Sequence, residues 1–249
     1  MITPTFKLTG LDAIIKSLER TDKQVRFAVA KSLTLTAKAV QSDLTTEMKR
    51  AFDRPTPYTL RSTFVKSATR DNLTAVVGIK DMLPAKAAAS PAEILGHQFR
   101  GGGRIRKNLE NYLIKAGLLG SGEFVAPGTG ARFDQFGNMS RGQVQQIISQ
   151  LRLGIDPHVW TSKSKRSQRN IAKAGRIFWS RGGVRDAHLP RGAWIDMGGS
   201  TGLRPLLMVI NRPSYRRRVD IDQIAAASVK RNWDRIFETA LVDAFATAR

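Results

Sequence analysis

The pattern of hydrophobic and polar positions is most regular between Thr21 and Phe52, where apolar side chains recur every three or four residues. This spacing places side chains on one face of an α-helix. The residues in step are Val29, Leu33, Thr36, Val40, Leu44, Met48 and Phe52. Thr21 is a suitable N-cap, and Pro55 and Pro57 end the helix because proline disfavours a helical predecessor. We therefore expect a long helix whose apolar stripe is buried against the rest of the protein.

Two stretches of alternating polarity follow this helix, Thr59 to Thr69 and Leu73 to Lys80. Alternation with a period of two is typical of half-buried β-strands. The residues between them, Arg70, Asp71 and Asn72, favour a turn. The sequence therefore predicts a β-hairpin directly after the long helix.

The remaining elements are predicted in the same way. We expect helices at Leu11–Arg20, Asn108–Leu119, Ser140–Leu153 and Asp222–Ala248, a short element at Ala92–Phe99, a glycine-rich loop at Gly117–Gly137, and strands at Arg176–Ser180, Gly192–Met197 and Leu206–Ile210. The apolar face of the last helix contains Trp233, Phe237, Ala240, Leu241 and Ala244. This face matches that of the first long helix, so we expect the two to pack together.

The order of elements predicts an α+β fold, in which a long N-terminal helix and a C-terminal helix pack on a small antiparallel sheet. Residues 1–97 and 191–249 are expected to form the two parts of this core. Residues 98–190 are glycine-rich and basic, and we interpret them as a long insertion.

The charge of the chain is strongly positive. Its 249 residues contain 41 Lys and Arg against 20 Asp and Glu, a formal net charge of +21. Such a field favours a polyanionic partner: nucleic acid, a membrane surface or an acidic protein. The chain has no Cys, which excludes disulfides and thiolate metal sites. No apolar run reaches the length of a membrane span, and no signal peptide is visible, so we expect synthesis in the cytoplasm and no membrane partner.

Ser200 lies in the sequence Gly198-Gly199-Ser200-Thr201-Gly202, which matches the nucleophile elbow of hydrolases. That chemistry needs a helix after the serine. Pro205 and the strand predicted after it favour a glycine turn between two strands instead. We therefore expect no hydrolase activity.

Other catalytic arrangements have little support. The three histidines, His97, His158 and His188, are isolated, so a zinc site is not expected. Asp220 and Asp222 are close enough in sequence to hold Mg²⁺, as in a nuclease, but capping of the last helix explains Asp222 better. The sequence predicts a protein that is not an enzyme and holds no cofactor or metal.

Three groups of basic residues are candidate contacts to nucleic acid or to a protein partner. The first has nine cations and only one acid, Asp186, and contains Lys163, Lys165, Arg166, Arg169, Lys173, Arg176, Arg181, Arg185 and Arg191. The second contains Arg100, Arg104, Arg106 and Lys107, and the third contains Arg216, Arg217 and Arg218. Phosphate contacts need charge and reach but no base-edge geometry. Contact with duplex DNA and docking on an acidic neighbour explain these groups equally well.

Several motifs lie in the N-terminal and C-terminal parts of the chain, on either side of the predicted insertion, and we call these two parts the frame. The pattern Gly-Leu-Asp-x-x-Ile-x-x-Leu spans Gly10–Leu18, and further segments are Arg54–Thr63, Thr74–Ile79, Arg204–Ile210 and Tyr215–Ile221. Together they resemble the tail completion proteins of tailed bacteriophages, of the minor tail protein Z type, and the related small head–tail neck proteins. The resemblance covers residues 10–80 and 192–248.

The resemblance implies a non-enzymatic virion protein with an α+β frame. It implies a homo-oligomeric ring, usually of six copies, at the head–tail junction. The implied partners are a tail terminator or tail tube protein, the capsid connector or adaptor proteins, and the double-stranded DNA in the channel. Two alternatives remain open: a sequence-nonspecific nucleic-acid-binding module, and a nuclease that uses Asp220 and Asp222.

Overall fold

The computed structural model describes residues 23–82, 89–153, 175–183, 188–198 and 202–246. They divide into two compact units, one from residues 1–102 with 215–249 and one from residues 103–214. The helix expected at Leu11–Arg20 and the cap expected at Thr21 lie outside the described residues.

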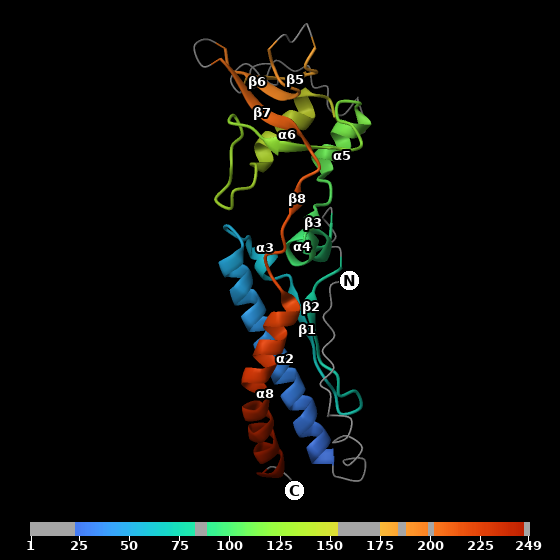
Figure 1. The fold of residues 1–249 in the computed structure, drawn as a ribbon, viewed down its shortest axis with the longest axis vertical. Helices are drawn as coiled ribbons and strands as arrows, with labels where there is room; N and C mark the ends of the chain where they lie inside the picture. Colours follow the sequence, from blue (N-terminus) through green and yellow to red (C-terminus); the bar gives the residue numbers. More distant parts are fainter. Residues whose placement is uncertain (1–22, 83–88, 154–174, 184–187, 199–201, 247–249) are drawn as a thin grey trace. The chain divides into compact units, whose positions relative to one another are not determined.

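The first unit is built on two long helices, α2 (Lys23–Ala51) and α8 (Ile221–Ala246). They lie side by side (Figure 1, blue and red). Val29 and Leu33 of α2 share an apolar cluster with Trp233 and Phe237 of α8. The small residues Ala28, Ala240 and Ala244 are almost fully buried and form a further cluster between the helices. The pairing of the two apolar faces agrees with the sequence prediction, and the α+β fold class is confirmed.

The predicted hairpin is present but shorter. Strand β1 (Thr63–Lys66) pairs antiparallel with β2 (Val76–Ile79), with Thr63 opposite Ile79. Residues from Thr59 were predicted as strand, but they belong partly to a short helix, α3 (Pro57–Leu60). The Thr56 hydroxyl accepts a hydrogen bond from the Thr59 amide at 3.2 Å. This cap and the proline at the first helical position favour a helical turn there.

Helix α4 (Pro91–Arg100) covers the end of the first unit at which α2 finishes and α8 begins. Ser90 and Glu93 form a reciprocal capping box at its start. Leu95 and Phe99 pack in one cluster with Leu44 and Met48 of α2, with Ile221 of α8 and with Val219, which precedes α8. This cluster fixes the C-terminal end of α2 against the hairpin and the start of α8.

The second unit has its own sheet and core. Strands β4 (Glu123–Pro127), β7 (Leu203–Asn211), β6 (Gly192–Asp196) and β5 (Arg176–Ser180) form an antiparallel sheet in that order. Helices α5 (Asn108–Lys115) and α6 (Arg141–Gln150) supply the other side of its core. Ser140 caps α6, as the sequence predicted. The chain passes between the units at β3 (Gly102–Gly103) and β8 (Ser214–Tyr215).

Two sequence interpretations differ from this arrangement. The glycine-rich stretch Gly117–Gly137 was predicted as loop, yet it contains β4, because Phe124 and Val125 can be buried in register with β7. Residues 191–214 were assigned to the core of the long helices, but β6 and β7 pair with strands of the second unit. The unit therefore ends at residue 214 and not at residue 190.

Candidate polyanion-binding groove

Arg104, one of the predicted contact residues, is held inside the second unit by Glu110. Its Nη2 lies 2.6 Å from Glu110 Oε1, and its Nη1 donates to Oε2 at 2.8 Å. The Arg104 side chain is 11% exposed and that of Glu110 is 0% exposed. The guanidinium also lies over the ring of Phe124, 4.9 Å from its centre. These contacts assign Arg104 to the interior of the unit, so its charge is already compensated.

The neighbours of Arg104 also have intramolecular roles. Arg106 donates to the carbonyl oxygen of Ser121 and lies over the Phe124 ring at 4.9 Å. The backbone amide of Lys107 donates to Glu110 Oε2 at 2.8 Å, which caps α5. Burial alone would raise the pKa of Glu110, but the hydrogen bonds from Arg104 and from the amides of Val125 and Lys107 lower it overall.

Three further predicted arginines form ion pairs or hydrogen bonds within their own units. Arg191 pairs with Glu123 at 2.5 Å, and this pair holds the pKa of Glu123 below its usual value. Arg217 pairs with Asp220 at 2.7 Å. Arg218 donates to the carbonyl oxygen of Ala51 at 3.3 Å. Their charges are therefore partly used within the fold.

The other predicted residues are exposed or not described. Arg100, Arg176, Arg181 and Arg216 are exposed, and Arg176 lies opposite Asp196 in the β5–β6 register. Lys163, Lys165, Arg166, Arg169, Lys173 and Arg185 lie outside the described residues, as do His158 and Ser200. The contact role of these residues stays a prediction.

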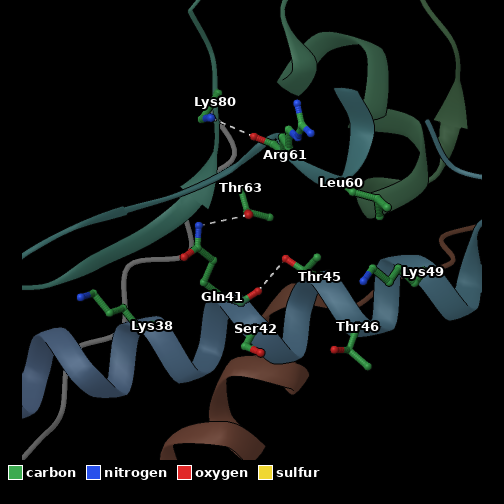
Figure 2. A pocket seen from close by; sticks show the side chains of 10 residues that line it. All are labelled: Lys38, Gln41, Ser42, Thr45, Thr46, Lys49, Leu60, Arg61, Thr63 and Lys80. Carbon is green, nitrogen blue, oxygen red and sulfur yellow. Dashed lines mark hydrogen bonds between the residues drawn. The ribbon is translucent and has the colours of Figure 1, made fainter. Parts of the chain in front are cut away.

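The structure instead reveals a basic groove between α2 and the hairpin of the first unit, with a volume of about 550 Å³. Figure 2 shows the α2 residues on one side and the hairpin residues on the other. Its walls are formed by Lys38, Gln41, Ser42, Thr45, Thr46 and Lys49 from α2, and by Leu60, Arg61, Thr63 and Lys80 from the α3–β1–β2 segment. Sequence reasoning did not single out this set.

The α2 wall exists because its polar residues repeat with the helical period. Positions 38, 41, 42, 45, 46 and 49 are spaced by three, one, three, one and three residues, so they share a face beside the apolar stripe. The acidic residues of α2, Asp43 and Glu47, do not line the groove. Asp43 is paired with Arg231, and Glu47 with Arg50 at 2.9 Å.

Hydrogen bonds fix the hairpin wall and join it to the helix. The Lys80 ammonium donates to the Arg61 carbonyl oxygen at 2.8 Å, and the Lys80 amide donates to the Ser62 carbonyl oxygen at 2.8 Å. Across the groove, Gln41 Nε2 donates to Thr63 Oγ1 at 3.2 Å. The ammonium has three N–H donors, and its bond to Arg61 uses one. The charge of Lys80 is thus held in place while donors are left for a ligand.

The electrostatics of the groove favour an anion. Its lining carries four cations, Lys38, Lys49, Arg61 and Lys80, and none of these lining residues is acidic. Asp81 follows Lys80 in sequence, and its carboxylate accepts a hydrogen bond from the Ser90 hydroxyl at 3.0 Å. The Thr45 hydroxyl already donates to the Gln41 carbonyl oxygen at 2.8 Å, but the Thr63 hydroxyl accepts from Gln41 and can still donate to an oxygen anion. The groove is therefore suited to binding phosphate or carboxylate groups.

The described part of the chain contains neither a metal-ligand cluster nor a membrane-spanning helix. No group of three or more His, Cys, Asp or Glu residues there could hold a metal ion. No helix within the described ranges is long and apolar enough to cross a bilayer. Comparison with protein-family models, with curated proteins and with solved structures found no match.

Proposed function

We propose that this protein is a structural component of a tailed-phage virion, and that it joins head and tail as part of a ring around the DNA channel. The observation that carries the proposal is the packing of α2 and α8 on the β1–β2 hairpin. This is the frame implied by the resemblance over residues 10–80 and 215–248. Residues 192–214, which were also part of the resemblance, belong to the second unit and give the frame no support.

Exposed apolar side chains on the helix pair are compatible with contacts between copies. Val242 and Phe245 of α8 are 69% and 58% exposed, and Phe27 of α2 is 39% exposed. They belong to the same end of the pair, where Lys31 bridges to Asp243 at 2.8 Å. Apolar side chains gathered on a surface are typical of places where another protein binds. In a ring, neighbouring subunits would cover them.

Co-expression with the tail tube and connector proteins encoded beside its gene tests this function. The expected result is a ring-sized species by light scattering, and particles in which filled heads carry tails. Phe245→Ser should reduce ring formation, whereas Thr239→Ser, a mild change at an exposed position of α8, should not. If the protein co-purifies with none of these virion proteins, and particles assemble normally without it, the proposal is wrong.

A second candidate function, a sequence-nonspecific nucleic-acid-binding module, is favoured by the cation-lined groove of the first unit. The two functions differ in assembly state. A binding module should shift DNA by itself as a small species, and it should do so without any virion protein. A joining protein should be found in the particle.

A further inference from the structure

We propose that the groove between α2 and the hairpin binds consecutive backbone phosphates of duplex DNA without regard to sequence. The inference deepens the proposed function, because it names the residues that would hold DNA in an assembled particle. The four cations of the groove come from positions 38, 49, 61 and 80, so only the fold brings them together. The site is thus a property of the first unit alone.

The length of the α2 wall suits a run of phosphates. Lys38 and Lys49 lie at the two ends of the wall (Figure 2). Along a helix that rises 1.5 Å per residue, they are separated by about 16 Å of axis. Duplex DNA carries one phosphate charge per about 1.7 Å of helix axis, counting both strands, so a wall of this length can face several phosphates. Arg61 and Lys80 supply cations from the opposite wall, between the ends of the row.

The lining chemistry favours phosphate over an apolar small molecule. Pockets for small organic ligands are lined mostly by hydrophobic side chains. Here Leu60 is the one aliphatic side chain among the ten lining residues, and the others are cations, hydroxyls and one amide. Gln41 donates to Thr63, and the Thr45 hydroxyl donates to the Gln41 carbonyl oxygen at 2.8 Å. The four cations and the Thr63 hydroxyl therefore remain as donors for a ligand. Such donors recognise oxygen anions and carry no base-edge pattern.

The placement of acids supports a polyanion as the occupant. The two acids of α2 are paired on other faces, with Arg231 and Arg50. A long polyanion is therefore not repelled along the α2 wall. The net charge of +21 attracts such a ligand from a distance. Because the acids of α2 are paired away from the groove, a polyanion that is attracted by the net charge meets no acid on the α2 wall.

Binding of a random-sequence 24-base-pair duplex, followed by fluorescence anisotropy over a series of salt concentrations, tests the proposal. The test variant carries Lys38→Gln, Lys49→Gln, Arg61→Gln and Lys80→Gln. The matched control carries Lys115→Gln, Arg132→Gln, Arg141→Gln and Arg204→Gln, all exposed positions of the second unit and none of them a predicted contact residue. Both variants lose four positive charges, so a general effect of net charge is the same in each. Thermal melting verifies that both fold.

The expected result is at least a tenfold loss of affinity for the groove variant at about 0.1 M salt. The steepness of log K against log salt should fall by about 3.6, because each of the four lost cation–phosphate contacts removes about 0.9. The control variant should lose less than threefold in affinity for the duplex, and its slope of log K against log salt should change by less than one. Equal losses in both variants would show that net charge alone attracts DNA, and would overturn the groove as a site.

A second probe separates phosphate from an acidic protein surface. Polyglutamate of comparable charge should bind the unaltered protein at least tenfold more weakly than the duplex. Polyglutamate could instead bind as tightly as DNA, and its affinity could fall as much as that of DNA in the groove variant. In that case the groove docks an acidic protein and the proposal is wrong. The assay uses the purified protein without virion partners. The assay can therefore support DNA binding by the groove even if the proposed head–tail joining is wrong. It can also refute DNA binding by the groove while head–tail joining stands.

Discussion

Arg104 and Glu110 are joined by two charge-assisted hydrogen bonds inside the second unit, at 2.8 and 2.6 Å. The backbone amides of Val125 and Lys107 donate to the same carboxylate, at 3.0 and 2.8 Å. Glu110 therefore links α5, the segment before it and strand β4. A residue taken from a basic cluster in the sequence is in fact the partner of a buried acid.

Replacing Glu110 with Gln should strongly destabilise the second unit. The change leaves the Arg104 guanidinium buried without its counter-charge, and breaking a buried pair in this way costs about 3–5 kcal/mol. Urea unfolding followed by tryptophan fluorescence measures the effect, since Trp179 and Trp194 lie in this unit. Arg191→Gln is the control. It breaks the more exposed pair with Glu123 and should cost less than about 1 kcal/mol. Equal costs would contradict the structural role of the buried pair.

The stability of the second unit should fall in acid because of Glu110. Burial on its own raises the pKa of this carboxyl, but its hydrogen bonds lower it below the ordinary value of 4.5. The pKa of this carboxyl is therefore lower in the folded protein than in the unfolded chain. The stability that results is fully present at a pH above the unfolded pKa, and it is lost as the pH falls through the folded pKa. Urea midpoints between about pH 6 and about pH 3 should therefore decline. Glu110→Gln should flatten this decline, and an unchanged slope would argue against the assignment.

Truncating Leu44 should weaken the first unit. Leu44 is 0% exposed and packs with Met48, Ile79 and Val219. Leu44→Ala removes these contacts and leaves a cavity, which costs about 2–5 kcal/mol. Leu35→Ala is the matched control on the same helix, because Leu35 is 39% exposed. Thermal melting should show a clear loss for the first variant and a small one for the second, and similar shifts would refute the packing.

Removing the second unit should leave the first able to fold. A β-carbon placed on Gly101 would lie 3.2 Å from the carbonyl oxygen of Tyr215, so the two ends of the first unit are adjacent. A short Gly-Ser linker can therefore replace residues 103–214 without stretching the chain. The shortened protein should unfold cooperatively in urea and keep its helical circular dichroism. A non-cooperative transition would mean that the first unit needs the second.

From its nine cations and single acid, we also hypothesise that the stretch from Lys163 to Arg191 lines or approaches the DNA channel of the assembled ring, and this channel hypothesis can be tested. Changing Lys163, Lys165, Arg166 and Arg169 together to Ser should leave particles able to assemble but alter DNA retention or ejection. Counting filled and empty heads by electron microscopy, before and after triggered ejection, measures this. If tails simply fail to join filled heads, the stretch docks a protein and the channel hypothesis is wrong.

The long helices and the hairpin could be predicted because their signals are local. The positions predicted to be in step from Val29 to Met48 keep a helical period over several turns, and all of them are buried. Phe52, predicted to be the last of them, is only half-buried and lies just after the helix ends at Ala51. Strand Arg176–Ser180 was predicted with its observed bounds. Strand β4 could not be found in this way, since its neighbours are glycines and its burial depends on β7.

The groove could not be predicted for a different reason. Clusters of arginine that are adjacent in sequence attract attention, yet Arg104, Arg191 and Arg217 are paired with carboxylates in the fold. Lys38, Lys49, Arg61 and Lys80 are separated in sequence, and their assembly depends on how the hairpin crosses α2. One local signal was available: the period of the polar residues on α2 that lie beside its apolar stripe.

The division of the first unit between two distant parts of the chain sets the order in which the protein can fold during its synthesis. Helix α2 ends at Ala51, but α8, which covers its apolar face, is complete only at Ala246. At about 5–20 residues per second, the ribosome needs about 10–40 s to make the residues between them. The second unit can fold within that interval, because residues 103–214 are contiguous. During the same interval Val29 and Leu33 lack their partners on α8, so α2 is exposed to chaperones and to premature association until translation is nearly finished.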